Sequence, residues 1–145
     1  MKEILIQLVT AFLGSLGFAL LFGLRRRYLL PAALGGLLSW GVYLLCSHLF
    51  PSVFLAGLAA SAFSVVYAEM LARLMRTPAT LFVIPAVIPL VPGSSLYYTM
   101  SCVVQRDLAA AREYGVQTLE FALAIAMGMS FVLALRDLRT RKQSS

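Results

Sequence analysis

The sequence predicts an all-α integral membrane protein with about five transmembrane helices, the fourth of them broken by prolines near the midplane. The 145-residue chain is 61% hydrophobic and 12% charged, with a mean hydropathy of +0.88. A soluble domain of this size could not bury so much apolar surface. The apolar runs are long and continuous rather than alternating with a period of two, which excludes barrel strands. We therefore expect one transmembrane domain over residues 1–145.

The first expected span is residues 4–24, which carry no charge. As a helix this segment is roughly 31 Å long, enough to cross the hydrocarbon core. A signal peptide would have a shorter apolar core, and small residues would follow it at a cleavage site. Three consecutive arginines, residues 25–27, follow here instead. The sequence therefore predicts a retained first helix.

Four further spans follow, each separated from the next by a short joint. Residues 29–49 form the second span, and Pro31 falls in its first turn, where a missing N–H does no harm. The other spans are residues 53–70, 78–104 and 118–135, and the fourth is expected to be broken at 91–95. Thr77 is the expected N-cap of the fourth span.

The basic residues predict the orientation. Nine Lys and Arg side chains lie in the first loop, the third loop and the C-terminal tail, against two in the fourth loop and one at the N-terminus. The side with more Lys and Arg is normally cytoplasmic. We therefore expect an external N-terminus and a cytoplasmic C-terminus. Because this pattern already accounts for the net charge of +6, nucleic acid is not an expected partner.

Two stripes of small residues recur at a spacing of four. Such stripes let membrane helices approach closely, because packing drives helix association in lipid. We expect both to be packing faces and candidate docking faces. The first stripe is Ala56, Ala60, Ser64 and Ala68, and the second is Ala122, Ala126, Ser130 and Ala134.

The proline-rich stretch PAVIPLVPGSSLYYTM, residues 85–100, interrupts the fourth span. Each proline removes one helical N–H and releases the carbonyl four residues earlier, so the carbonyls of residues 81, 85 and 88 need other partners in protein or water. Gly93 permits backbone angles that other residues avoid. Ser94 and Ser95 are the expected N-caps of a restarted helix.

Segment lengths place this break near the middle of the bilayer. A restarted helix directs free N–H groups into the midplane and favours a carboxylate, whereas released carbonyls favour an ammonium group or a cation. A ligand-free kink is the alternative. The candidate substrate-binding residues are Pro85, Pro89, Pro92, Gly93, Ser94, Ser95 and Tyr98.

Two acidic residues are weaker candidates for a coupling or gating role. Glu69 precedes Arg73 by four residues, which favours a surface ion pair, and a proton-coupling carboxylate is the alternative. Asp107 lies at the expected outer mouth, where it is a gate or simply solvated. Cys46 and Cys102 lack the spacing of a metal site, and whether they pair stays open. We expect no cofactor and, without a nucleophile–base pair, no enzyme.

The run IPAVIPLVPGSSLYYTM, residues 84–100, resembles the signature of the small membrane subunit of the threonine/serine exporter family. A polar QRDLAAA step and an Ala-rich last helix with Gly128 follow in the same order. The resemblance implies export of threonine and serine, or of succinate as in some members, across the bacterial cytoplasmic (inner) membrane. It marks residues 92–95 as the functional motif. It also implies a larger membrane subunit as partner, whose half is absent from this chain.

Two functions stay open at this point. The first is a subunit of a secondary transporter that exports small carboxylate-bearing metabolites. The second is a scaffold that does not transport and only stabilises a larger partner. Transport predicts a wet cavity at residues 91–95, whereas a scaffold predicts a dry, packed kink. A homo-oligomer also stays open.

Overall fold

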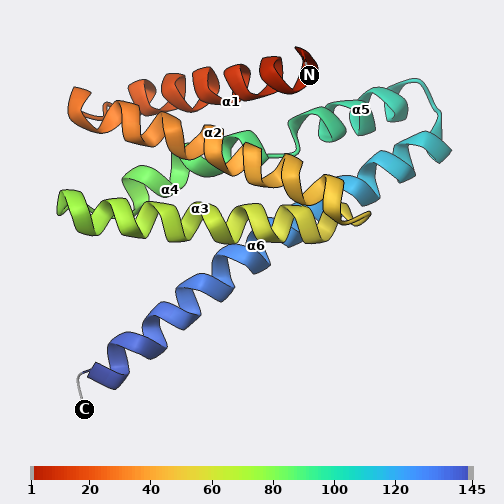
Figure 1. The fold of residues 1–145 in the computed structure, drawn as a ribbon. Coiled ribbons are helices and arrows are strands. Elements are labelled where there is room, and N and C mark those ends of the chain that lie inside the picture. The colour runs from red at the N-terminus through yellow and green to blue at the C-terminus, as the bar shows by residue number, and fades with distance from the viewer. Residues whose placement is uncertain (1, 144–145) are drawn as a thin grey trace.

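The computed structural model describes the backbone of residues 2–143 and the side chains of residues 2–138. Every regular element in this part of the chain is helical (Figure 1). In chain order the elements are α1 (Lys2–Leu21), α2 (Arg26–Leu49), α3 (Val53–Met75), α4 (Thr80–Val87), the 3₁₀ turn η1 (Ile88–Leu90), α5 (Gly93–Val104) and α6 (Leu108–Gln143).

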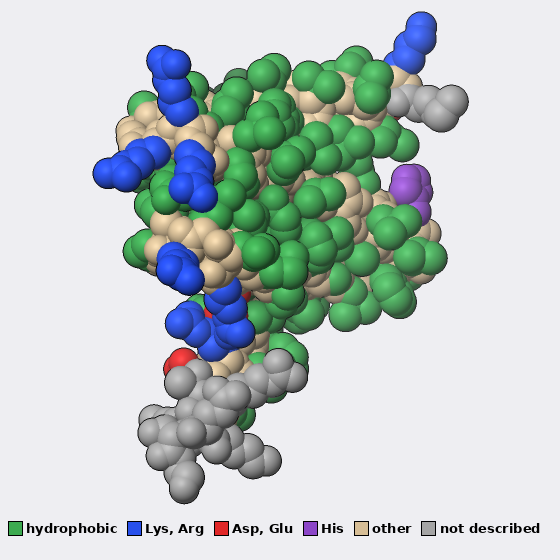
Figure 2. All heavy atoms as spheres, turned by 60° about the vertical axis from the view of Figure 1, so that its left-hand side comes forward, with side chains coloured by type: hydrophobic (Ala, Val, Ile, Leu, Met, Phe, Trp, Pro, Cys, Tyr) green, Lys and Arg blue, Asp and Glu red, His purple; other side chains and the backbone are tan. Residues whose placement is uncertain are grey.

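Four helices, α1, α2, α3 and α6, are long and apolar enough to cross a membrane. A fifth span results if α4–η1 and α5 count as one, and these two halves meet at an angle of 47°. Apolar side chains cover most of the outer surface between the two ends of the bundle (Figure 2). The prediction of an all-α protein with about five membrane-spanning helices is confirmed. The depth of the break in a bilayer stays a prediction.

Several helix boundaries differ from the expected ones, for local reasons. Helix α1 already ends at Leu21, where Gly23 adopts a φ of 67° and the Leu24 N–H closes the helix on the Ala19 carbonyl at 3.1 Å. Helix α3 continues past residue 70 to Met75 and ends at Arg76, whose φ is 52°. A polar segment ends a transmembrane run but not necessarily a helix.

Helix α6 also includes a polar segment, because it begins at Leu108 rather than at residue 118. The Asp107 carboxylate accepts a hydrogen bond from the Ala110 N–H at 3.2 Å and so caps the first turn. Residues 109–111 are alanines, the strongest helix formers. The segment that we expected to be a loop is therefore the first part of a long helix.

The bundle is built by close packing of small residues on α3. Helix α3 contacts both α2 and α6, while α4 lies against α1, α2 and α3, and α5 runs along α6 (Figure 1). All four residues of the first small stripe are buried, so this stripe is a packing face. At Gly57, a Cβ would lie 3.2 Å from the Ala124 Cβ, which shows how closely α3 and α6 approach.

The second small stripe does not pack inside the chain, so this half of the expectation is corrected. Its four residues, Ala122, Ala126, Ser130 and Ala134, are exposed. Helix α6 instead turns Phe121, Ala124 and Gly128 toward the interior. The bulky ring of Phe121 packs beside Leu90 and Ala60, and this contact fixes the rotation of α6 about its axis.

The chain alternates between two ends of the bundle. The α1–α2 turn, the end of α3 and the start of α4 share one end, where Leu24, Tyr28, Met75 and Ala79 pack on one apolar cluster. The α2–α3 and α5–α6 turns lie at the other end (Figure 1). On the face shown in Figure 2, most of the coloured Lys and Arg side chains, which belong to residues 2–138, gather at the first end. His48 lies in the last turn of α2, next to the second end.

Candidate functional site

The proline junction is assembled from three short pieces. Pro85 lies buried inside α4, Pro89 lies in η1, and Pro92 forms the N-cap of α5. The η1 turn connects the two helices because two prolines within four residues cannot both fit an α-helical ladder. Leu90, at its end, is only 1% exposed, so the junction begins inside the bundle core.

Two of the carbonyls released by the prolines have donors. The hydroxyl of Ser15 on α1 donates to the Pro85 carbonyl at 2.8 Å, and both groups are buried. The Val91 N–H donates to the Ile88 carbonyl at 3.1 Å. Sequence reasoning missed Ser15, although a serine inside an uncharged span is itself a signal that some acceptor lies nearby.

Gly36 on α2 makes the contact between Ser15 and Pro85 possible. A Cβ on this residue would overlap the Ser15 side chain and lie 3.2 Å from the Pro85 carbonyl. Glycine therefore lets α1, α2 and α4 meet at one point. The three helices therefore contact one another at the inner half of the junction.

Further buried hydroxyl groups fasten α3 to α2 next to this point. Ser64 donates to the Ser39 hydroxyl at 2.7 Å, and Ser39 donates to the Gly35 carbonyl at 2.7 Å. The Tyr67 hydroxyl donates to the Pro31 carbonyl at 2.9 Å. Each of these hydroxyls has a partner, so they serve packing between the two helices.

The outer half of the junction differs from the expectation. Helix α5 begins at Gly93, and Pro92 is its N-cap without a side-chain hydrogen bond. Ser94 and Ser95 are therefore not N-caps, because the Pro92 carbonyl already accepts the Leu96 N–H at 3.1 Å. Ser94 is exposed, and the half-buried Ser95 donates back to the Pro92 carbonyl at 3.2 Å.

Gly93 has more space than we expected. The φ angle of Gly93 lies outside the left-handed region. Among the glycines of the described residues, only Gly23 has a φ in that region. A Cβ built on Gly93 would meet no atom within 4 Å. The chain's own packing therefore does not require glycine there.

Tyr98 is exposed and packs toward α6 rather than toward the prolines. Its ring centroid lies 5.5 Å from that of Tyr114 and 5.6 Å from that of Tyr97. No residue of α5 is buried. The structure thus brings Pro85, Pro89 and Pro92 to one junction, with Gly93 and the two serines at its open side, and leaves Tyr98 on the outer surface.

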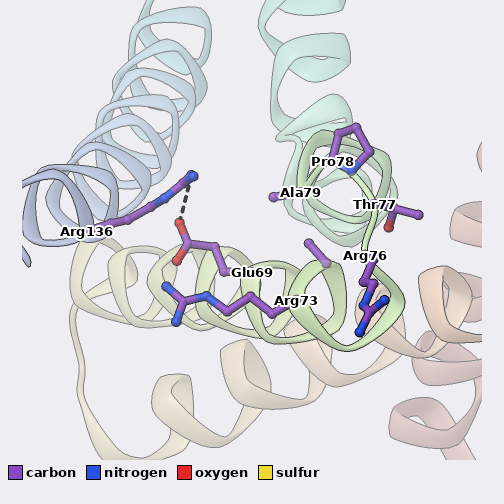
Figure 3. A pocket seen from close by; sticks show the side chains of 8 residues that line it. Glu69, Arg73, Arg76, Thr77, Pro78, Ala79 and Arg136 are labelled. Carbon is purple, nitrogen blue, oxygen red and sulfur yellow. Dashed lines mark hydrogen bonds and ion pairs between the residues drawn. The ribbon is translucent and has the colours of Figure 1, made fainter. Parts of the chain in front are cut away.

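The two acidic candidates have separate partners. Glu69 pairs with Arg136 of α6 at 3.4 Å, rather than with Arg73 on its own helix (Figure 3). Asp107 caps α6, as described above. Thr77, the expected N-cap of the fourth span, does not cap it, because Ala79 holds that position. The Thr77 hydroxyl is instead buried without a hydrogen-bond partner among the described residues.

A pocket of about 370 Å³ lies beside Glu69 at the basic end of the bundle. It opens between the last turns of α3, the α3–α4 turn and α6 (Figure 3). Its lining residues are Glu69, Ala72, Arg73, Arg76, Thr77, Pro78, Ala79 and Arg136. Sequence reasoning missed this pocket because Arg136 is 67 residues from Glu69 along the chain.

Cys46 and Cys102 are free thiols. Among the described residues, no group of three or more His, Cys, Asp or Glu side chains is placed to hold a metal ion.

The long apolar helices and the interrupted fourth segment define a multi-pass α-helical membrane protein. The family model described as Threonine/Serine exporter, ThrE matches residues 7–135. The chain therefore belongs to the threonine/serine exporter family, whose members are transporters. No solved structure matches it.

Proposed function

We propose that this chain is a subunit of a secondary transporter that exports small carboxylate-bearing metabolites, serine and threonine first and succinate-like acids second, across the cytoplasmic membrane. The proline junction forms part of the substrate path. The chain acts together with a larger membrane subunit. The family match supports the exporter class, and the structure of the junction supports the location of the path.

One observation carries this proposal: the interrupted fourth segment is anchored at one half and open at the other. Helix α4 and η1 are seated among α1, α2 and α3, with Ser15 holding the Pro85 carbonyl. Helix α5 lies along α6 and buries no residue. A junction between a fixed and an open half is suited to a site whose access alternates, as in transporters with discontinuous helices.

The chemistry of the open half favours a carboxylate. Helix α5 has 12 residues and starts at Gly93. A helix N-terminus attracts negative charge through its free N–H groups and its dipole. Ser94 and Ser95 add hydroxyl groups beside this terminus. The space around Gly93 lets a ligand approach the backbone.

The exposed faces of α5 and α6 support a larger subunit as partner. Leu96, Met100 and Val104 on α5 are 53%, 63% and 82% exposed. The stripe Ala122, Ala126, Ser130 and Ala134 on α6 is also exposed. Small stripes of this kind let a second membrane helix pack closely. Assembly of identical chains and a scaffold that does not transport are the alternatives that the following experiments separate.

The first experiment compares Gly93→Leu with Gly17→Leu in cells that carry the complete exporter. Both positions have no atom within 4 Å of a built Cβ, and leucine favours helix over glycine by roughly 1 kcal/mol. Both variants should therefore insert and fold. We expect Gly93→Leu to reduce serine and threonine efflux at least about tenfold, a change in barrier of about 1.4 kcal/mol. Normal efflux by a well-inserted Gly93→Leu exporter would contradict a substrate path there.

The second experiment reconstitutes the purified chain in liposomes loaded with labelled serine, threonine or succinate. We expect gradient-dependent efflux only when the larger subunit is present. Efflux from liposomes that hold this chain alone would contradict the partner requirement and favour a homo-oligomer. If the larger subunit alone gives the same efflux with and without this chain, the result would favour a scaffold role for the chain.

A further inference from the structure

The pocket at the basic end of the bundle combines charges of both signs with small apolar side chains. The lining contains three arginines, Arg73, Arg76 and Arg136, and a single carboxylate, that of Glu69. Ala72, Pro78 and Ala79 form the apolar part of the lining. In Figure 3, Glu69 and Arg73 project from α3 and Arg136 projects from α6 toward one gap, and Ala79 faces this gap from the other side, whereas Arg76 points away from Glu69.

We propose that this pocket is a second binding site, specific for a small zwitterionic α-amino acid. In this arrangement the guanidinium group of Arg73 holds the α-carboxylate, and Glu69 holds the α-ammonium group. This proposal rests on the proposed function, in which the exported amino acid arrives from the cytoplasmic side. It places amino-acid recognition at the basic end, separate from the proline junction.

The state of Glu69 supports its role toward an ammonium group. Its side chain is 14% exposed, and Oε1 lies 3.4 Å from Nη1 of Arg136, whose side chain is 49% exposed. A carboxylate offers about four acceptor positions on two oxygens, so the pair with Arg136 does not use its full capacity. A distance of 3.4 Å is also longer than the roughly 2.7–2.9 Å of a strong charge-assisted bond.

The excess of positive charge supports the carboxylate subsite. Three guanidinium groups against one carboxylate leave two positive charges in excess within the lining. Guanidinium groups match carboxylate oxygens in a planar, two-bond geometry. Because the Arg136 guanidinium is already engaged with Glu69 and Arg76 points away from Glu69 (Figure 3), Arg73 is the residue that we assign to the ligand carboxylate.

Size and charge together select the class of ligand. The open pocket has a volume of about 370 Å³, which is near the lower limit of small-molecule pockets, roughly 300–1,000 Å³, so it suits a compact molecule. The apolar lining accommodates a side chain of one or two carbons. A dicarboxylate or a phosphate dianion would place a second negative charge near Glu69, which like-charge repulsion disfavours. An amino acid places a positive charge there instead.

The test measures binding of labelled L-threonine and succinate to the purified chain in phosphatidylcholine nanodiscs. All variants are made in a Gly93→Leu background, so that binding at the junction does not contribute. We expect saturable threonine binding with one site per chain. Arg73→Gln should weaken it at least about tenfold, whereas the control Arg27→Gln, at the same end but outside the pocket lining, should change it less than about twofold.

Glu69→Gln gives the sharpest result, because two ligands should respond in opposite directions. We expect threonine binding to weaken by about fivefold or more through loss of the ammonium partner, while succinate binding strengthens by a similar factor. A folding defect would weaken both. Equal loss for both ligands in a variant that unfolds with the same free energy as the parent, or no change for either ligand, overturns the proposal.

Two further outcomes would also overturn it. The first is the absence of threonine binding in the Gly93→Leu background. The second is that threonine does not bind, while native mass spectrometry shows bound phosphatidylglycerol that is lost in Arg73→Gln. The latter would assign the pocket to a lipid headgroup. Transport is measured separately. Threonine binding that depends on Arg73, together with no transport by the exporter that also contains the larger subunit, would leave the pocket in place and refute the proposed function.

Discussion

Replacement of Ser15 by alanine tests how the broken helix is stabilised. Ser15 is fully buried, and its hydroxyl donates to the Pro85 carbonyl at 2.8 Å. The usual helical donor for this carbonyl would be the N–H of residue 89, which is a proline and has none. Ser15→Ala therefore leaves a buried carbonyl without the donor that now satisfies it.

The expected cost depends on whether the lost hydrogen bond leaves a buried acceptor without a partner. Interhelical hydrogen bonds in membrane proteins contribute about 0.6 kcal/mol on average and up to about 1.7 kcal/mol. A buried acceptor left without a partner costs about 1–3 kcal/mol. Because the Pro85 carbonyl belongs to the second case, we expect Ser15→Ala to lower the free energy of unfolding by about 2 kcal/mol. The control Ser47→Ala, at an exposed serine that bonds within its own helix, should cost less than about 0.5 kcal/mol.

The assay is reversible unfolding in mixed micelles with increasing dodecyl sulfate, extended to a double-mutant cycle with Pro89→Ala. Alanine at position 89 restores an N–H four residues after Pro85. In that background the cost of Ser15→Ala should fall by about 1 kcal/mol, a coupling that only interacting groups show. An equal cost of Ser15→Ala in both backgrounds would refute the reasoning, as would a cost no larger than that of the control.

Three other predictions concern a close helix contact, a buried hydroxyl group and the membrane topology. In Gly128→Ala the added Cβ would lie 2.6 Å from the Leu58 carbonyl, so we expect a loss of about 1–3 kcal/mol in the same unfolding assay. Thr77→Val removes a buried hydroxyl that has no partner among the described residues, so the variant should unfold with a free energy about 1 kcal/mol higher than the parent. Reporter fusions after Arg27 and after Ser145 should report the same, cytoplasmic side of the membrane, and opposite sides would contradict the topology.

The sequence is sufficient to predict the features that depend on the residue pattern of long segments. Continuous apolar runs predicted the helical membrane class, and the spacing of Ala56, Ala60, Ser64 and Ala68 predicted a packing face that is buried. The stripe on α6 shows the limit of the same argument. Ala122 and Ala126 have the same spacing, but the contact of Phe121 with Leu90 turns them outward. Spacing predicts that a stripe exists, while bulky neighbours decide which way it faces.

The parts of the candidate site that depend on distant contacts were not predictable in this way. Pro85 and its released carbonyl could be identified from the sequence, but its donor, Ser15, is 70 residues away. Glu69 was assigned to the nearest base on its helix, Arg73, whereas its partner, Arg136, comes from α6. In both cases several partners were chemically equivalent, and only the packing of the helices selects one.

Water access to the proline junction tests the central claim most directly. Ser94→Cys and Ser95→Cys are made singly in a chain whose Cys46 and Cys102 are replaced by alanine. They are then exposed to a membrane-impermeant thiol reagent in the complete exporter. Leu13→Cys, on an exposed apolar face of α1, is the lipid-facing control. We expect both junction cysteines to react and serine or threonine to slow the reaction, while Leu13→Cys stays unlabelled. Junction cysteines that are as unreactive as Leu13→Cys would indicate a dry, packed kink and contradict the account.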